Sequence, residues 1–151
     1  MKLEDAIKST KFRDEGHKAT LNILYTAYWL KSKFSGAMKE LGMTSEQFNV
    51  MRILKGKHPE EMCVKDIGSR MIEKSSNVPR IIDRLVDKKL VKRTTSKEDK
   101  RETLISLTDK GIKQLTEASK IMDDTGINII GVSNEEAAQL NELLEKLRTS
   151  D

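Results

Sequence analysis

The 151-residue chain has one cysteine, two histidines and two prolines, and it lacks any long run of apolar residues. A single cysteine excludes a disulfide within the chain and fits a reducing cytoplasm. The absence of about 18 consecutive apolar residues excludes a typical membrane-spanning helix. The opening residues MKLEDAIKST are too acidic and too poor in apolar side chains for a signal peptide. We therefore expect a cytoplasmic protein that does not associate with a membrane.

Patterns typical of catalysis and of metal binding are also missing. His17 and His58 lie far apart in the sequence, and the single thiol, Cys63, has no evident base near it. The sequence contains no glycine-rich phosphate loop and no cluster of Cys, His and Asp residues. We therefore expect no catalytic residues, no metal site and no cofactor, which argues against an enzyme and against a metal sensor.

Charged residues are abundant and unevenly distributed. They make up 34% of the sequence and hydrophobic residues 36%, a balance typical of one helical soluble domain. Residues 44–108 carry 15 basic and 10 acidic side chains, whereas residues 109–151 carry 5 basic and 9 acidic ones. A basic middle segment suits contact with phosphate, although ordinary surface charge would give a similar pattern.

Both ends of the chain predict helices with more apolar surface than a small domain needs. Apolar residues recur at three- and four-residue steps from Glu15 to Leu41, in two stripes. Another such helix begins at Ser133, which has the spacing of a capping box with Glu136. A two-fold interface between two copies would bury this surface. The residues expected in that interface are Leu21, Leu24, Leu140, Leu143, Leu144 and Leu147. The alternative is a monomer that packs these leucines into its own core.

The middle of the chain predicts three helices in succession. Thr44 and Gln47 have the spacing of a capping box, which marks the start of a helix. A short helix fits residues 64–72, and a turn separates it from a further helix at about residues 76–89. This order is typical of a helix-turn-helix.

Pro79 and the apolar pattern locate the helix at residues 76–89. Because a proline is tolerated only in the first turn, Pro79 favours Ser76 over Ser75 as the N-cap. The apolar side chains fall on one face and are Val78, Ile81, Ile82, Leu85 and Val86. The opposite face carries Asn77, Arg80, Arg84 and Lys88.

A β-hairpin is expected directly after this helix. Residues 90–95 and 102–107 contain β-branched side chains at alternating positions, and the polar turn at residues 96–101 joins them. Thr108 then caps another long helix. Helix, turn, helix and hairpin together form the order of a winged helix-turn-helix.

Two segments together resemble the MarR family of transcriptional regulators. They are SSNVPRIIDRLVDKKLVKR at residues 75–93 and EDKRETLISLTDKG at residues 98–111. The second contains the Asp-x-Arg pattern of that family's wing, here Asp99 and Arg101, followed by Leu-Thr. The resemblance extends over nearly the whole chain.

The resemblance implies a mainly α fold with a small β-hairpin wing, in which a winged helix-turn-helix is flanked by N- and C-terminal dimerisation helices. Residues 44–108 would form the DNA-binding lobe, and residues 1–43 and 109–151 the helical dimerisation region, within one compact domain. A homodimer would bind a pseudo-palindromic operator in double-stranded DNA, with half-sites about 10 base pairs apart. The resemblance favours a repressor, although the residues themselves reveal neither the operator sequence nor the direction of regulation.

The helix that follows the turn carries the candidates for the major groove, because the first turns of an inserted helix reach base edges best. Arg80 suits a bidentate contact to guanine, Asn77 could pair with adenine, and Pro79 could touch a thymine methyl group. Phosphate contacts set register rather than sequence. The residues better placed for phosphates are Ser75, Ser76 and Arg84.

The hairpin tip carries the candidates for the minor groove. Arg101 would enter it where narrow A·T tracts concentrate negative potential, and Lys97 and Lys100 would flank it on phosphates. The resemblance implies that Asp99 holds Arg101 in place. For Arg101 the alternative is an ordinary charge at the hairpin tip. For Arg80 and Arg84 it is a solvated helix face with weak salt bridges to Asp83, Asp87 or Asp99.

Function and regulation leave alternatives open. A winged-helix protein-interaction module could keep this fold without binding DNA. Members of the MarR family are commonly switched by small aromatic or phenolic effectors, or by cysteine oxidation. Tyr25, Tyr28 and Trp29 could line a pocket for such a ligand, although aromatic residues at helical spacing more often belong to the core. Cys63 departs from the redox-sensing positions, so we expect a poorly reactive thiol.

Overall fold

Helices make up most of the structure, and one small sheet interrupts them. The computed structural model describes residues 1–129 and 131–148, so residue 130 and residues 149–151 of the expected dimerisation region lie outside the described part. The elements in chain order are α1 (Leu3–Ile7), α2 (Glu15–Lys39), α3 (Ser45–Lys55), β1 (Met62–Cys63), α4 (Val64–Arg70), α5 (Val78–Asp87), β2 (Val91–Thr95), β3 (Thr103–Leu107), α6 (Asp109–Ile129) and α7 (Asn134–Arg148). The predicted mainly α fold with a β-hairpin is confirmed.

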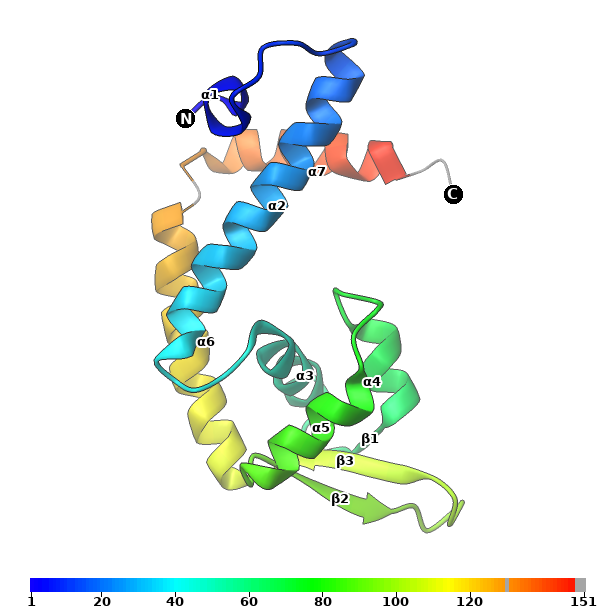
Figure 1. Cartoon of the computed structure of the whole chain (residues 1–151). Coiled ribbons are helices and arrows are strands. Elements are labelled where there is room, and N and C mark those ends of the chain that lie inside the picture. Colours follow the sequence, from blue (N-terminus) through cyan, green and yellow to red (C-terminus); the bar gives the residue numbers. More distant parts are fainter. Residues whose placement is uncertain (130, 149–151) are drawn as a thin grey trace.

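The molecule is elongated, with the sheet at one end and helices α1 and α7 at the other (Figure 1). Helices α3, α4 and α5 gather with the three strands into a lobe, whose elements run from residue 45 to residue 107. The long helices α2 and α6 pack against each other and run from the lobe to the opposite end. A helix-turn-helix and its hairpin therefore stand at one end of a two-helix scaffold.

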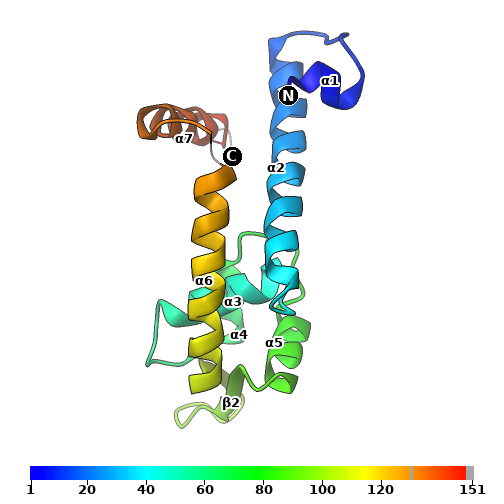
Figure 2. The same cartoon turned by 90° about the vertical axis from the view of Figure 1, so that its left-hand side faces the viewer.

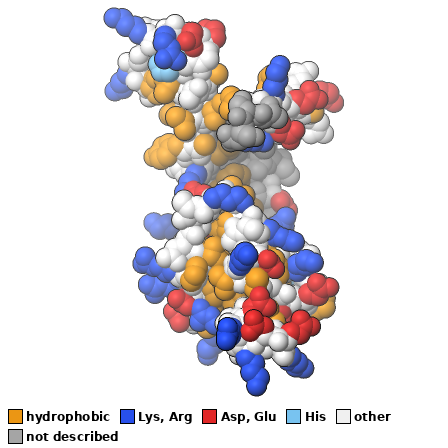
Figure 3. All heavy atoms as spheres, turned by 90° about the vertical axis from the view of Figure 1, so that its right-hand side faces the viewer, with side chains coloured by type: hydrophobic (Ala, Val, Ile, Leu, Met, Phe, Trp, Pro, Cys, Tyr) orange, Lys and Arg blue, Asp and Glu red, His pale blue; other side chains and the backbone are white. Residues whose placement is uncertain are grey.

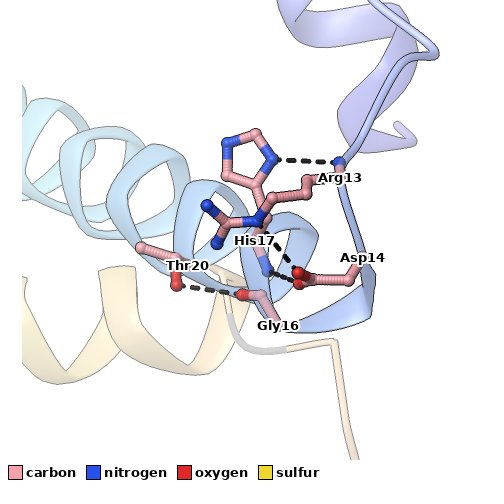
Figure 4. A network of polar contacts seen from close by, with 5 residues as sticks. All are labelled: Arg13, Asp14, Gly16, His17 and Thr20. Atoms are coloured by element: carbon pink, nitrogen blue, oxygen red, sulfur yellow. Dashed lines mark hydrogen bonds and ion pairs between the residues drawn. The ribbon is translucent and has the colours of Figure 1, made fainter.

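The long helix α2 starts at an aspartate N-cap. Asp14 accepts a hydrogen bond from the backbone N–H of His17 at 2.7 Å, and its carboxylate pairs with Arg13 at 3.0 Å (Figure 4). The bond from the His17 backbone is the largest cause that lowers the pKa of Asp14. Thr20 donates to the carbonyl oxygen of Gly16 at 2.9 Å within the first turn. The cap satisfies an amide that would otherwise lack a partner at the helix start.

The predicted long helix is confirmed, and a glycine follows its end. α2 stops at Lys39, close to the predicted Leu41, and Gly42 adopts a left-handed φ of 60° that a residue without Cβ reaches cheaply. The structure adds the short helix α1, which no pattern in the sequence predicts. An ion pair of 2.6 Å between Glu4 and Lys18 ties α1 to the first turns of α2.

The helix-turn-helix forms around a local cap and a common core. Thr44 Oγ1 accepts from the backbone N–H of Gln47 at 3.1 Å, and the Gln47 side chain accepts from the N–H of Thr44 at 3.3 Å, so the predicted capping box is confirmed. The apolar faces of α3, α4 and α5 meet in one core. Its fully buried side chains include Met51, Leu54, Ile67, Met71, Ile82 and Leu85. Ile82 and Leu85 lie on the apolar face that the sequence predicts for the helix at residues 76–89.

The start of α5 differs from the prediction by one residue. Asn77, not Ser76, is the N-cap, because its Oδ1 accepts from the backbone N–H of Arg80 at 3.2 Å. Pro79 therefore occupies the second helical position, where a missing N–H leaves no bond unmade. Serine and asparagine cap helices about equally well, so residue type alone does not separate the two positions.

The predicted hairpin is confirmed as strands β2 and β3, and a third strand joins it. β2 and β3 are antiparallel, with Val91 opposite Leu107. The short strand β1 pairs with β3 through Met62 and Cys63, which gives the sheet order β1-β3-β2. A strand of two residues is too short to show alternation, so the sequence pattern could not predict it.

The junction between the sheet and α6 accepts only glycine. A Cβ at Gly111 would lie 2.0 Å from the carbonyl oxygen of Leu90. Thr108 caps α6 as predicted, since its Oγ1 accepts from the N–H of Gly111 at 3.0 Å and donates to the carbonyl of Lys89 at 2.8 Å. These contacts fix the start of the long helix α6 against the first strand of the wing.

The C-terminal helix α7 begins at the second predicted capping box. The N–H of Ser133 donates to Glu136 at 2.8 Å, and the N–H of Glu136 donates to Ser133 Oγ at 3.3 Å. Figure 2 shows α7 projecting from the end of α6 rather than lying along it. None of the described side chains of α7 is buried. The helix therefore leaves its apolar face exposed in a single chain.

Candidate nucleic-acid interface

Five of the residues expected to contact DNA surround one hollow on the lobe. The hollow has a volume of about 310 Å³. The five residues are Ser75, Ser76, Asn77, Arg80 and Arg84. The start of α3 and the turn before α5 complete the lining, and Pro79 is exposed on the same first turn of α5. The structure thus brings the helix start and its two arginines together.

Polar contacts hold α5 against the sheet and against α3. Asp83 of α5 forms an ion pair with Arg93 of β2. At the other end of α5, Lys88 Nζ donates to the carbonyl of Gly42 and, at 3.0 Å, to Oε1 of Gln47. A helix held in this way presents its first turns in one orientation, which lowers the ordering cost of binding.

The tip of the wing is organised around a buried serine. Ser96 is 7% exposed, and its Oγ accepts from the N–H groups of Glu98 and Asp99, each at 3.3 Å. Asp99 Oδ1 in turn accepts from the backbone N–H of Arg101 at 2.9 Å. The contact between Asp99 and Arg101 therefore runs through the arginine backbone, and the guanidinium group stays exposed.

The cations expected to contact DNA, on α5 and at the tip of the wing, form no ion pair with the residues that the structure describes. These exposed cations are Arg80, Arg84, Lys97, Lys100 and Arg101. Asp83, which was an alternative partner for the arginines of α5, pairs with Arg93 instead. Lys and Arg side chains project around the rim of the lobe in Figure 3. The interface candidates therefore lose no salt bridge on meeting a phosphate.

Comparison with known proteins identifies the family of this winged helix-turn-helix. The family model for the transcriptional regulator SarA/Rot matches residues 32–118, more than half of the chain. The chain belongs to the SarA/Rot family of transcriptional regulators. The match spans the end of α2, the whole lobe and the first half of α6. It includes every residue that the sequence of this SarA/Rot protein marks for DNA contact.

Individual relatives agree with membership of the SarA/Rot family. The HTH-type transcriptional regulator YkoM of Bacillus subtilis is 34% identical over 112 residues, which cover 72% of this chain and 70% of YkoM. A MarR transcription factor from Planctomyces limnophilus superposes with a TM-score of 0.70 at 27% identity, covering 93% of this chain and 100% of the other. The predicted resemblance to MarR regulators is therefore confirmed.

Two further structures share this fold at lower identity. The complex of S. aureus MepR with DNA has a TM-score of 0.78 and 23% identity, and the match covers 87% of this chain and 97% of MepR. The organohalide-sensing regulator RdhR with bound 2,4-dichlorophenol has a TM-score of 0.81 and 21% identity, covering 90% of this chain and 80% of RdhR. The SarA/Rot chain thus shares its fold with two regulators, of which MepR was solved with DNA and RdhR with a small ligand.

Contacts between elements position this SarA/Rot interface, and the sequence did not reveal them. Asp83 and Arg93 belong to different elements, and no local pattern pairs them. Only the contacts of Ser96 could have been predicted from the sequence, because a serine in a polar turn often accepts hydrogen bonds from the backbone N–H groups two and three residues later.

The two hollows described here are lined by residues other than Tyr25, Tyr28 and Trp29, and Tyr28 is 71% exposed. A ligand pocket lined by these aromatic residues stays a prediction. The other hollow lies between α3 and α6, has a volume of about 470 Å³ and is lined in part by Arg52, Lys55 and other charged side chains.

Within residues 1–129 and 131–148, no three His, Cys, Asp or Glu side chains lie together in a group that could hold a metal ion. No helix there combines the length and the apolar character needed to cross a membrane.

Proposed function

We propose that this transcriptional regulator is a homodimer that binds double-stranded DNA at a pseudo-palindromic operator. The observation that carries the proposal is the arrangement of the lobe, where the first turns of α5 and the tip of the wing present exposed cations at the same end of the molecule (Figure 1). The MepR–DNA complex, which shares the fold, supports it. In the proposed complex α5 enters the major groove and the wing enters the minor groove.

The structure refines the proposed roles on α5. Arg80 remains the candidate for a bidentate contact to guanine. Asn77 uses its Oδ1 on the helix cap, so its amide donor alone is left for a base, and a bidentate contact to adenine would break the cap. Ser76 is the weakest phosphate candidate, because its Oγ is buried and has no hydrogen-bond partner in the described part of the chain.

The dimer belongs to the same proposal, with residues 1–43 and 109–151 as the dimerisation region and residues 44–108 as the DNA-binding lobe. The exposed fractions are 62% for Leu24, 50% for Leu140, 65% for Leu143 and 58% for Leu147, whereas Leu21 and Leu144 are half-buried. Hydrophobic side chains are visible over α2 in the upper part of Figure 3. A second copy would cover this surface, which the chain's own core leaves open.

Salt dependence tests the proposal against a winged-helix module that binds protein instead. Arg84, Lys97 and Lys100 from two protomers would contact about six phosphates, which predicts a slope of about −5 for log affinity against log salt. Affinity for a duplex that the protein selects from random sequences should then fall about 10³-fold between 50 and 200 mM salt. Fluorescence anisotropy measures both quantities. A protein that selects no duplex, or binds one with a flat salt response, would contradict DNA binding.

We also propose that the bound dimer represses transcription in the cytoplasm, since a dimer on an operator excludes other proteins from that DNA, and that a small phenolic effector releases it. The hollow between α3 and α6 is large enough for such a ligand, and the fold is shared with RdhR bound to 2,4-dichlorophenol. Titration of 2,4-dichlorophenol and related phenols into the protein–duplex complex should lower the anisotropy. Retention of the complex at millimolar phenol would count against this effector class.

A further inference from the structure

A lysine of the long helix α2 joins two carboxylates of the lobe. Lys31 Nζ forms an ion pair with Glu73, in the turn between α4 and α5, and lies 3.8 Å from Oε1 of Glu46 in the first turn of α3. The bond to Glu73 is the largest cause that raises the pKa of Lys31. In Figure 1 this turn projects from the top of the lobe, on the side away from the sheet. The contact therefore bridges the scaffold and the segment that leads into α5.

Glu73 also shapes the start of α5. Its backbone carbonyl accepts from the N–H of Ser76 at 3.1 Å, and the carbonyl of Ser76 accepts from the N–H of Val78 at 3.0 Å. Asn77, between them, is the N-cap of α5. A displacement of Glu73 is thus passed within a few residues to the first turn of α5, which lines the hollow of the candidate interface.

Few other contacts hold the turn between α4 and α5 in place. Its ends are anchored in the core, since Met71 is 2% and Val78 5% exposed, but Ile72 between them is 85% exposed. The N–H of Ile72 donates to Asn49 Oδ1 at 3.1 Å, which ties the turn to α3. Lys31 supplies a tie to α2, the helix that carries part of the expected dimer surface.

We propose that Lys31 is a positioning residue for DNA binding, which sets the first turn of α5 relative to α2 through Glu73 without touching DNA itself. The inference rests on the proposed DNA-binding function. An exposed ion pair shifts an equilibrium by about fivefold at most, and a dimer contains two such pairs. Loss of the Lys31 charge is therefore expected to weaken binding to the selected duplex by about 5- to 25-fold.

The test compares Lys31→Met with Lys33→Met by fluorescence anisotropy at several salt concentrations. Lys31→Met should bind about 5- to 25-fold more weakly with the wild-type salt slope, because no phosphate contact is lost. Lys33 is an exposed lysine of the same helix with no ion pair among the described residues, so its variant should stay within about twofold of wild type. Lys31→Arg keeps the ion pair and should bind as wild type does.

A charge swap and an exchange measurement sharpen the test. Lys31→Glu combined with Glu73→Lys should recover most of the affinity that either single reversal loses. In the free protein, Lys31→Met should speed hydrogen exchange of the amides at residues 73–78 and leave those at residues 96–102 unchanged.

Four results would overturn the inference. They are unchanged affinity of Lys31→Met, a salt slope shallower by about 0.9 for each Lys31 lost, no recovery in the double variant, and unchanged exchange in the turn. If the wild-type protein selects no duplex, the proposed function fails and this inference fails with it. If the wild-type protein binds and Lys31→Met matches it, only the inference fails.

Discussion

Replacing Arg101 with alanine should weaken binding to the selected duplex by about 30-fold or more, while the fold and the dimer persist. A specific arginine contact contributes about 1–3 kcal/mol, and a dimer presents it twice. The guanidinium group is exposed at the wing tip, so its removal leaves the core intact. The bond from the Arg101 backbone to Asp99 does not involve the side chain, so the loop keeps its shape.

The Arg101 measurement needs a control for net charge. Lys113→Ala removes one positive charge from an exposed position on α6 and should bind within about twofold of wild type. Arg101→Lys keeps the charge but loses the planar fork, so it should recover only part of the affinity. Wild-type affinity for Arg101→Ala in an anisotropy titration at fixed salt would remove the wing from the proposed mechanism.

Leu143→Asp should convert the proposed dimer into monomers and abolish tight binding to the duplex. Burial of a leucine contributes about 1.5–3 kcal/mol, and a two-fold interface contains the residue twice. An aspartate at the same place would also have to lose its water. We therefore expect the dissociation constant of the dimer to rise by more than about 100-fold. Sedimentation velocity at micromolar concentration measures the change.

Folding of the single chain should survive this substitution, because Leu143 is 65% exposed there. Circular dichroism checks that the helices remain. Glu142→Ala, at the neighbouring exposed position of α7, should leave the dimer intact. A wild-type protein that sediments as a monomer would contradict the proposal, as would a Leu143→Asp protein that stays dimeric. Arg101→Ala should remain a dimer, which separates the DNA contact from the subunit contact.

Local signals in the sequence predicted most elements of this fold. The capping boxes at Thr44 and Ser133 were found because their hydrogen bonds span three residues and need no tertiary partner. The prediction ended the helix at residue 89, whereas α5 ends at Asp87. A glycine in the left-handed conformation usually marks a helix end, but here Lys89 adopts that conformation, so the sequence carried no such mark. Strand β1 was not predicted, because its two residues form a strand only by pairing with β3.

A motif in the sequence identified the residues of the candidate interface, but it did not show which of them form ion pairs or hydrogen bonds within the chain. The sequence allowed Asp83 to neutralise an arginine of α5, and the packed chain pairs it with Arg93. It proposed Asn77 as a reader of adenine, and the structure uses the Asn77 side chain as a helix cap. Lys31 and Glu73 are 42 positions apart, so nothing in the sequence connected them.

By itself, the sequence determined the succession of helices and hairpin, the family motif and the apolar surplus at both ends of the chain. These properties follow from side-chain periodicity and from hydrogen bonds between residues a few positions apart. Only the tertiary structure decided which cations lack a partner, how the wing tip closes on Ser96 and how α2 reaches the turn before α5. Such contacts join elements whose separation is set only when the core packs.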